Sequence, residues 1–368
     1  MKQKIKKGIT DFSSDDLESL VTGLNYPSYR ARQITHRLYH NLASSWDEFT
    51  ELPGKLRNEL SGKYPLHSLE VIASRESTDG SIKSLFRLND GQTVESALMI
   101  YGRSSGQGFR GTVCVSSQVG CAIGCPFCAT GQGGFQRNLS AGEIIDQVLY
   151  FAKIMRNRYV EQNYNKYSTL TNIVFMGMGE PMANYDQVLK AIRMINSPDG
   201  MNIGARNITI STAGIVPGIQ KLADEKLQVG LAVSLHAGTD ALRSRLIPLN
   251  RKYPIAEVIT ACREYFEKTG RRVTYEYVLF QGINDTFSEA RALGELLKDQ
   301  NCHINLIPAN HTASKEYRAP SPADILAFMT ELKKYHLKVT VRQSRGQDIE
   351  AGCGQLRSRL GYSHSGGN

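Results

Sequence analysis

Three cysteines stand close together in the stretch Cys121-Ala-Ile-Gly-Cys125-Pro-Phe-Cys128, at C-x3-C-x2-C spacing. Thiolates are soft ligands that select zinc or iron–sulfur clusters over hard cations. A structural zinc site needs four ligands, usually from paired C-x2-C motifs, and this loop supplies three with no fourth nearby. Three thiolates on a cubic four-iron cluster leave one iron open for a ligand. The spacing therefore predicts a catalytic iron–sulfur centre, and a zinc site closed by a distant His or Cys is the alternative.

Composition and charge limit the class of protein. The 368 residues suffice for one large domain with a smaller companion. Lys and Arg total 44 against 35 Asp and Glu, and this net charge of +9 favours a polyanionic partner such as RNA or DNA. The seven cysteines lack a disulfide-like spacing, and the charged first residues precede no apolar segment. With no stretch long enough to span a bilayer, we expect a cytoplasmic protein without a membrane partner.

Residues 1–65 are predicted to form a helical accessory domain. Ser13 or Ser14 can cap the first helix, a second begins at Pro27, and a third covers 53–60. One face of the second helix is cationic, and with the Lys-rich residues 1–7 it predicts an RNA-binding surface; a merely solvated face is the alternative. The cations of that face are Arg30, Arg32, His36, Arg37 and His40.

Residues 66–106 change to alternating hydropathy and are predicted to form a β extension. The segments 83–88 and 93–98 flank Asn89-Asp90-Gly91, which is a strong hairpin signal. The Gly- and Ser-rich segment 101–111 reads as a flexible connection to the main body.

The main body, residues 107–345, alternates strands with helices. Strands are expected at 112–116, 172–176, 207–211, 230–235, 273–279, 304–307 and 338–341, and helices at 141–156, 184–195, 215–225, 254–268, 286–299 and 322–335. This order predicts an α/β fold with a parallel sheet, either a partial or complete (β/α) barrel or, as the alternative, an open doubly wound sheet. Residues 346–368 form a C-terminal loop and tail.

Small and polar residues follow the predicted strands, where sites of such folds collect. They are found at 121–128, 177–181, 211–214, 234–237, 305–310 and Cys353. His236 alone would read as a buried core residue, but its place beside Ser234 at a strand end favours a ligand contact.

Several further blocks stand in a set order along the chain. They read Cys114-Val-Ser-Ser-Gln-Val-Gly-Cys121, Cys128-Ala-Thr-Gly, Phe175-Met-Gly-Met-Gly-Glu-Pro181, Ser234-Leu-His-Ala237, Asn305-Leu-Ile-Pro308 and Cys353-Gly-Gln-Leu356. With the cysteine loop, in which Phe127 precedes the last cysteine, they resemble the bacterial dual-specificity adenosine C2-methyltransferase family of radical S-adenosylmethionine (SAM) enzymes. The resemblance extends over nearly the whole chain, to about Leu356.

The resemblance implies a partial (β/α) barrel of radical-SAM type and two cofactors, one [4Fe-4S] cluster per chain and SAM. The cluster ligands would be Cys121, Cys125 and Cys128. SAM would be bound by Gly179, Glu180, Ser211, Ser234, Leu235, His236 and Asn310. The implied partners are 23S rRNA, tRNA and a small electron donor of flavodoxin or ferredoxin type, and we expect a monomer.

The resemblance also implies a reaction that consumes two SAM molecules. Cys353 would take a methyl group from the first. A 5′-deoxyadenosyl radical from the second would remove hydrogen from that S-methyl group, and the methylene radical would add to adenine C2. Glu95 would accept the C2 proton, and Cys114 would attack Cys353 in a transient disulfide that frees the product. A surface role is the alternative for Glu95, and Cys262 and Cys302 are predicted to be inert core cysteines.

Two other functions stay open. Adenine C8 methylation, which confers antibiotic resistance, uses nearly the same motifs, although Pro181 and Arg345-Gly346 look more like the C2 enzyme. A non-catalytic RNA-binding protein with a structural zinc is the alternative from another class. The chain departs from the family pattern at Glu350-Ala351-Gly352 and at Ala309-Asn310-His311. We expect Gly352 to loosen the Cys353 loop and Ala309 to change the packing of the substrate, and neither change removes a group that the chemistry requires.

Overall fold

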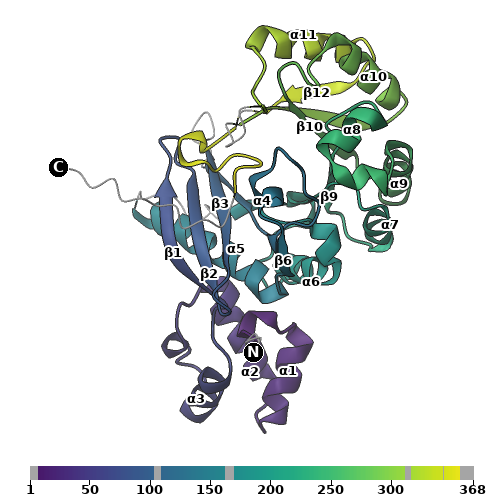
Figure 1. The fold of residues 1–368 in the computed structure, drawn as a ribbon. Coiled ribbons are helices and arrows are strands. Elements are labelled where there is room, and N and C mark those ends of the chain that lie inside the picture. Colours follow the sequence, from purple (N-terminus) through teal and green to yellow (C-terminus); the bar gives the residue numbers. More distant parts are fainter. Residues whose placement is uncertain (1–6, 103–108, 162–169, 311–315, 343, 357–368) are drawn as a thin grey trace, which may run out of the picture.

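One ten-stranded sheet forms the centre of the protein (Figure 1). The computed structural model describes residues 7–102, 109–161, 170–310, 316–342 and 344–356. The strand order is β1-β2-β3-β4-β7-β8-β9-β10-β11-β12. The Lys-rich residues 1–6, most of the predicted flexible connection, His311 and the tail beyond Leu356 lie outside the described residues.

The second part of the sheet is parallel, as predicted. It runs through β4 (Phe109–Cys114), β7 (Leu170–Phe175), β8 (Ile208–Thr212), β9 (Gly230–Ser234), β10 (Val273–Leu279), β11 (Cys302–Pro308) and β12 (Lys338–Val341). Among the described strands β1 and β12 are the edges, so the barrel is partial. The predicted α/β fold of partial-barrel type is therefore confirmed.

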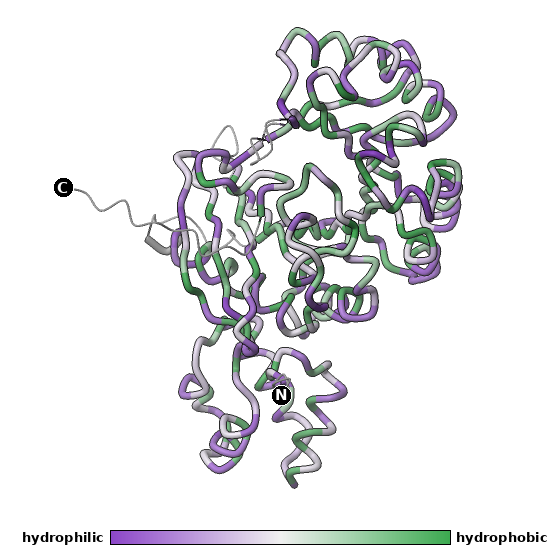
Figure 2. The backbone as a smooth tube through the Cα atoms, in the orientation of Figure 1, coloured by the Kyte–Doolittle hydropathy of each residue, from purple (hydrophilic) through white to green (hydrophobic). Residues whose placement is uncertain are grey.

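Amphipathic helices connect the parallel strands and cover the outside of the barrel (Figure 1). They are α5 (Ala141–Glu161), α6 (Tyr185–Asn196), α7 (Val216–Asp224), α8 (Asp240–Leu246), α9 (Ile255–Thr269), α10 (Phe287–Leu297) and α11 (Pro322–Lys333). In α6 the residues Val188, Ile192 and Ile195 recur at helical spacing and are buried. Figure 2 shows hydrophilic and hydrophobic residues alternating along these helices, as one buried face requires. The short helix α8 was not predicted.

The predicted β extension consists of β1 (Leu69–Glu76), β2 (Ile82–Leu88) and β3 (Thr93–Gly102), which pair antiparallel with one another and, through β3, with β4. The register places Lys83 opposite Ala97 and Ala97 opposite Cys114. Directly opposed residues share a face of the sheet, and so do residues two apart on one strand. Lys83, Glu95 and Cys114 therefore lie on the same face.

The N-terminal region is helical, with α1 (Ser14–Gly23), α2 (Tyr29–Thr35), the π-helical turn η2 (His36–His40) and α3 (Gly54–Lys63). Short 3-10 turns occur at Ile9–Asp11, Trp46–Glu48, Pro181–Asn184, Ala205–Asn207, Pro248–Arg251 and Gln347–Ile349. Ser13 caps α1: the amide of Asp16 donates to its hydroxyl, and its own amide donates to the Asp16 carboxylate.

Part of the predicted cationic face is engaged inside the N-terminal region. Arg37 forms a bidentate pair with Glu51, with donor–acceptor distances of 3.0 and 2.6 Å. Arg30 donates to the side chain of Gln33 and to the backbone carbonyl of Glu51. Both guanidinium groups thus hold the helices together, which reduces the cationic surface left for a partner.

A buried carboxylate of α5 fastens the N-terminal region to the barrel. Asp146 accepts hydrogen bonds from Thr10 Oγ1 at 3.2 Å, His67 Nδ1 at 3.1 Å and the amide of Ser68 at 2.6 Å. The other ring nitrogen of His67 lies 3.1 Å from the Ala43 carbonyl. Only an imidazolium can donate to both acceptors. Burial lowers the pKa of His67, but the hydrogen bond and charge of Asp146 outweigh it, and the pKa is raised.

Asp146→Ala is expected to lower the free energy of unfolding by roughly 3 kcal/mol, because it leaves several buried donors without an acceptor. The wild-type protein should lose part of its stability as the pH rises through the raised pKa of His67. That contribution is complete below about pH 6.5, the ordinary value of histidine. Urea unfolding between pH 5.5 and 8.5 measures both effects.

The control is Glu59→Ala, which removes an exposed ion pair with Lys63 on α3 and should change stability little. An Asp146→Ala protein that unfolds like the control would show that this junction contributes nothing to the free energy of unfolding.

No described helix is both long and apolar enough to cross a bilayer.

Candidate active site

A small β ribbon carries the cysteine loop. β5 (Gln118–Gly120) pairs antiparallel with β6 (Phe135–Asn138), and the loop ends at α4 (Ala129–Gln132). Gly120 has φ 73° and meets β6 so closely that a Cβ would lie 1.8 Å from the Gly134 carbonyl oxygen. Only glycine fits that position. The ribbon thus fixes where Cys121 begins the loop.

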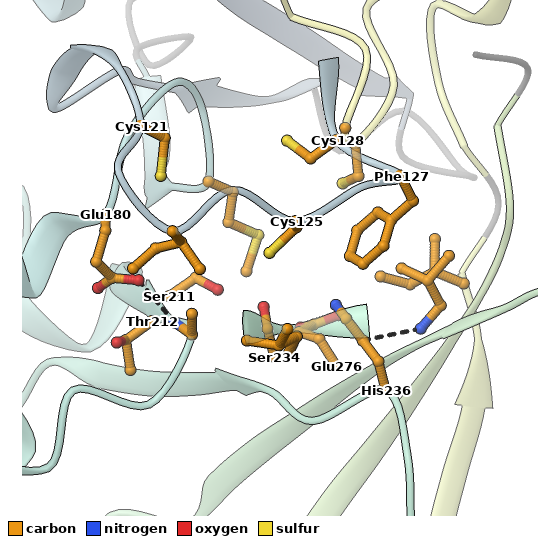
Figure 3. Close-up of a pocket in the computed structure, with 18 of the residues that line it drawn as sticks. Cys121, Cys125, Phe127, Cys128, Glu180, Ser211, Thr212, Ser234, His236 and Glu276 are labelled. Carbon is orange, nitrogen blue, oxygen red and sulfur yellow. Dashed lines mark hydrogen bonds between the residues drawn. The ribbon is translucent and has the colours of Figure 1, made fainter. Parts of the chain in front are cut away.

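The three thiols of the loop face a pocket over the strand ends (Figure 3). Burial raises the pKa of Cys121 to about 12, and burial and the charges of Cys128 and Cys121 raise that of Cys125 well above its ordinary value. Three thiolates would repel one another here without a cation, and metal binding deprotonates a coordinating thiol outright. The chemistry of this site therefore fits a positively charged metal centre.

The segment after β7 places a carboxylate at the pocket. Gly179 has φ 101°, and a Cβ there would lie 2.5 Å from Cβ of Gln118, so glycine is required. Glu180 is 4% exposed and accepts hydrogen bonds from the amides of Met182 at 3.0 Å and Ala213 at 2.7 Å. Burial raises its pKa despite these bonds. The carboxylate is therefore held in place and prepared to receive a further donor.

His236 follows β9 with a left-handed backbone, φ 59°. Burial, then the charge of Arg243, lowers its pKa to about 3, so the ring is neutral. Nδ1 accepts from the amide of Val278 at 3.1 Å, which places the proton on Nε2. His236 thus offers the pocket an N–H donor.

The remaining predicted SAM contacts differ in accessibility. Ser211 and Ser234 line the pocket at the ends of β8 and β9. Leu235 is fully buried, its amide donates to the Glu276 carbonyl and its carbonyl accepts from Arg243. Within the described part of the chain, Leu235 lies outside the pocket lining.

Arg243 of α8 joins the ends of β8 and β9 beneath the pocket. Its side chain is fully buried and donates to the carbonyls of Ala213 at 2.6 Å, Ser234 at 3.2 Å and Leu235 at 3.3 Å. A guanidinium has five donors, which suits it to such a set of acceptors. Arg243 therefore fixes the backbone from which the pocket side chains project.

Asn310 connects the pocket with the C-terminal loop. Its Nδ2 donates to the Cys353 carbonyl at 3.1 Å, and its Oδ1 is buried without a hydrogen-bond partner in the described structure. A buried acceptor without a donor is costly unless a ligand supplies one. Because Asn310 lines the pocket, its free Oδ1 fits a bound donor group.

Polar contacts from distant parts of the chain hold the loop that carries Cys353. Asp348 accepts from Ser77 Oγ at 2.5 Å and the amide of Thr78 at 3.1 Å, and the amide of Gly346 donates to Asp79 at 2.9 Å. On the other side, the amide of Ala129 and the hydroxyl of Thr130 donate to the carbonyls of Gly354 and Leu356. The β1–β2 turn and the cysteine loop thus hold the Cys353 loop between them by hydrogen bonds.

Cys353 lines the same pocket as the three loop cysteines. Burial raises the pKa of Cys114 to about 12, and the nearby charge of Cys353 raises it as well, whereas Arg342 acts in the opposite direction. The charge of Cys353 in turn raises the pKa of Arg342. All seven cysteines are free, so the predicted Cys114–Cys353 disulfide is not present in this state.

Glu95 is buried on β3, only 3% exposed, so the surface alternative is wrong for it. Its backbone is fixed at both ends: the amide donates to Met178 Sδ at 3.3 Å, and the carbonyl accepts from Ser116 Oγ at 2.5 Å. Cys262 and Cys302 are buried in the core, as predicted. In the described structure, Glu95 and Cys114 lie outside the pocket lining.

The pocket contains about 1020 Å³ of empty space, part of it open to solvent. No three His, Cys, Asp or Glu side chains in the described ranges are arranged around one metal ion. A cubic cluster does not need them to converge, because each thiolate binds its own iron. The thiols, the His236 donor and the free Asn310 acceptor therefore fit a cluster with a polar ligand.

Two charged residues that line the pocket, Glu276 and Arg342, were not predicted from the sequence. Glu276 is 5% exposed and accepts from Asn305 Nδ2 at 2.9 Å. Arg342 donates to the sulfurs of Met176 at 3.6 Å and Met99 at 3.9 Å. Signals for both existed: Glu276 is a charge within an apolar strand, and Arg342 directly follows the last strand, where polar site residues collect.

Comparison with known proteins identifies the family. Residues 115–292 match the radical SAM superfamily model, and residues 8–64 match that of the ribosomal RNA large subunit methyltransferase N-terminal domain. A probable dual-specificity RNA methyltransferase RlmN from Symbiobacterium thermophilum is 45% identical over 363 residues, 98% of this chain and 94% of the relative. The chain belongs to the RlmN family of radical SAM methyltransferases.

A second curated relative and a solved structure support the same family. The probable dual-specificity RNA methyltransferase RlmN of Geobacillus kaustophilus is 42% identical over 351 residues, covering 95% of this chain and 92% of its own. A crystal structure of a radical SAM methyltransferase from Sphaerobacter thermophilus superimposes with a TM-score of 0.90 at 48% identity, covering 96% of this chain and all of that one. The predicted family is confirmed, and radical SAM membership implies a [4Fe-4S] cluster and SAM.

Proposed function

We propose that this chain methylates C2 of adenine in 23S rRNA and tRNA through an S-methylcysteine at Cys353, using two SAM molecules per turnover. The observation that carries the proposal is the presence of Cys353 in the pocket of the three loop cysteines, with Cys114 close enough for their charges to interact. RlmN relatives named as dual-specificity RNA methyltransferases support RNA as the substrate.

Residues of the pocket are assigned to the two cofactors. Cys121, Cys125 and Cys128 hold one four-iron cluster per chain. SAM is held by the remaining predicted set, of which Gly179, Glu180, Ser211, Ser234, His236 and Asn310 line the pocket. Together the cofactors supply a one-electron cleavage that yields a radical able to take hydrogen from a methyl group. Leu235, which is packed away from the pocket, contributes by supporting its neighbours.

Three residues of the chain carry the remaining steps. Cys353 Sγ accepts a methyl group and, after losing one hydrogen atom from it, presents a methylene radical that adds to adenine C2. The Glu95 carboxylate accepts the C2 proton, and the one unpaired electron left on the adduct would return to the bound cluster. Cys114 Sγ then attacks Cys353 Sγ, so that an S–S bond forms while the S–CH2 bond breaks. The electron pair of the broken bond takes up a proton, which completes the methyl group of the released base. Reduction of this disulfide by an external dithiol returns both thiols for the next cycle.

Each of the predicted parts of the chain has its own role in the reaction. Residues 1–65 bind RNA, aided by the net charge of +9. Residues 66–106 supply Glu95, 107–345 form the barrel, and 346–368 include the methyl-carrying loop. A flavodoxin or ferredoxin supplies the electron, and the protein acts as a monomer.

Methyl-deuterated SAM tests the proposal. With an RNA fragment, the product methyl group should carry two deuterium atoms from the donor and one hydrogen from another source, because Cys353 loses one donor deuterium before transfer. Mass spectrometry of the digested RNA measures this. A methyl group that arrives with all three deuterium atoms would mean direct polar transfer and end the radical proposal.

The same digest separates the alternatives. Chromatography distinguishes 2-methyladenosine from 8-methyladenosine, and the latter would replace the C2 assignment with C8 methylation. A zinc-containing RNA-binding protein would give, after anaerobic reconstitution, neither a brown four-iron absorbance nor 5′-deoxyadenosine from SAM.

A further inference from the structure

Lys83 is a charged side chain in a place where lysine is rare. It lies on β2, its side chain is only 6% exposed, and it shares one face of the sheet with Glu95 and Cys114. Lysine is almost never buried unless its ammonium group is paired. The ammonium group of this buried lysine, close to the proposed reaction centre, must therefore have an ion-pair or hydrogen-bond partner.

The ammonium group of Lys83 contacts two parts of the proposed machinery. Nζ lies 3.6 Å from Oε1 of Glu95, whose side chain is 3% exposed. It also donates to the backbone carbonyl of Glu350 at 3.3 Å, three residues before Cys353. Residues separated by 267 positions in the chain thus meet at one ammonium group. Lys83 connects the predicted proton acceptor with the loop of the methyl carrier.

We propose that Lys83 is a positioning residue of the methyl-transfer reaction, which keeps the Glu95 carboxylate ionised and fixes it relative to the Cys353 loop. The inference rests on the proposed function, because it takes Glu95 as the group that accepts the C2 proton. In that step the C2–H bond breaks, the proton passes to a Glu95 carboxylate oxygen and the bonding electrons stay with the base.

Burial explains why such a residue is needed. A carboxylate removed from water without a cation takes up a proton and becomes neutral, and a neutral carboxyl group cannot accept another. An ammonium group at 3.6 Å favours the ionised form. The backbone of Glu95 is fixed by Met178 and Ser116, and the ammonium group of Lys83 contacts its side chain.

A second hydrogen bond gives Lys83 a geometric role. The carboxylate must reach C2 only after the methylene carbon of Cys353 is bound there. By holding the Glu350 carbonyl and the Glu95 carboxylate together, Lys83 sets the separation of the base and the carrier loop in the position of the loop that the structure shows. Arginine at position 83 would preserve the charge and both contacts in altered geometry. Methionine would preserve only the approximate length of the side chain.

The test compares Lys83→Met and Lys83→Arg in reconstituted, full-length protein with SAM and an RNA fragment. Lys83→Met should still form S-methyl-Cys353, seen by mass spectrometry of the protein. Its rate of 2-methyladenosine formation should fall by about 100-fold, the usual contribution of a general base. A covalent RNA–protein adduct should accumulate on denaturing gels, because the C2 proton is removed after the carbon–carbon bond has formed.

Lys83→Arg should recover most of the lost rate, because it keeps a positive charge beside Glu95. A merely structural ion pair would instead show in Lys83→Met as a lower melting temperature without accumulation of the adduct. Arg87→Met, on the same strand but in an exposed pair with Glu70, is the matched control and should behave as wild type. Melting temperature and iron content confirm that each variant is folded and loaded.

The experiment distinguishes failure of the proposed function from failure of the proposed role of Lys83. Wild-type protein that makes no 2-methyladenosine overturns the proposed function. Beside an active wild type, a Lys83→Met protein that works at the full rate, or one that stalls without S-methyl-Cys353 and without an adduct, overturns the role of Lys83.

Discussion

A Cys353→Ala protein should fold, bind its cofactors and transfer no methyl group to RNA, with a rate at least about 10⁴-fold below wild type. The contact that the structure gives Cys353 with Asn310 is made by its backbone carbonyl, which alanine keeps. The substitution therefore removes the methyl-accepting sulfur and little else. Incorporation of radiolabelled methyl groups from SAM into RNA measures the loss.

Cys302→Ala serves as the control for removing a thiol. Cys302 is buried at the start of β11 and away from the pocket, so its loss should lower stability slightly and leave the chemistry intact. Undiminished methylation by Cys353→Ala, beside an active Cys302→Ala protein, would refute the methyl-carrier role.

A Cys125→Ala protein should reconstitute without a stable four-iron cluster and should cleave SAM at no measurable rate, a loss of about 10⁴-fold or more. With one of three thiolates missing, an additional iron lacks its protein ligand. Iron and sulfide content, visible absorbance and the yield of 5′-deoxyadenosine measure this outcome.

The control here is Cys262→Ala in α9, where the thiol is packed in the core. That protein should bind iron as wild type does, with a modest loss of stability from the cavity. If Cys125→Ala retained a full iron content and the yield of 5′-deoxyadenosine, the three-cysteine assignment would be wrong.

The elements predicted from the sequence were those whose signals are local. The strand at 273–279 was predicted with its observed bounds, because an apolar run bounded by turn residues is a property of neighbouring residues. The Ser13 cap and the hairpin at Asn89-Asp90-Gly91 are local in the same way. The cysteine loop could be recognised because its ligands are only a few residues apart.

The residues that were not predicted make their contacts with residues far away in the sequence. Nothing near Lys83 indicates that it meets Glu95 and Glu350, because those contacts follow from strand register and from the return of the C-terminal loop. The ribbon of β5 and β6 was missed because its strands are only three and four residues long. Asn310 was predicted as a SAM contact, but its bond to the Cys353 carbonyl depends on tertiary structure alone.

The hydrogen bonds that hold the Cys353 loop determine how this loop can move. Hydrogen bonds to Asp348 and Asp79 hold one side of this loop and backbone carbonyls hold the other, while Ile349 and Leu356 are buried at its two ends. Such bonds can exchange partners with water at low net cost, whereas separating packed helices exposes hydrocarbon. The segment between these two buried side chains, which includes Cys353, can thus shift and return many times in the lifetime of one folded barrel. The same sulfur can then visit two working positions while the cofactor chamber stays rigid.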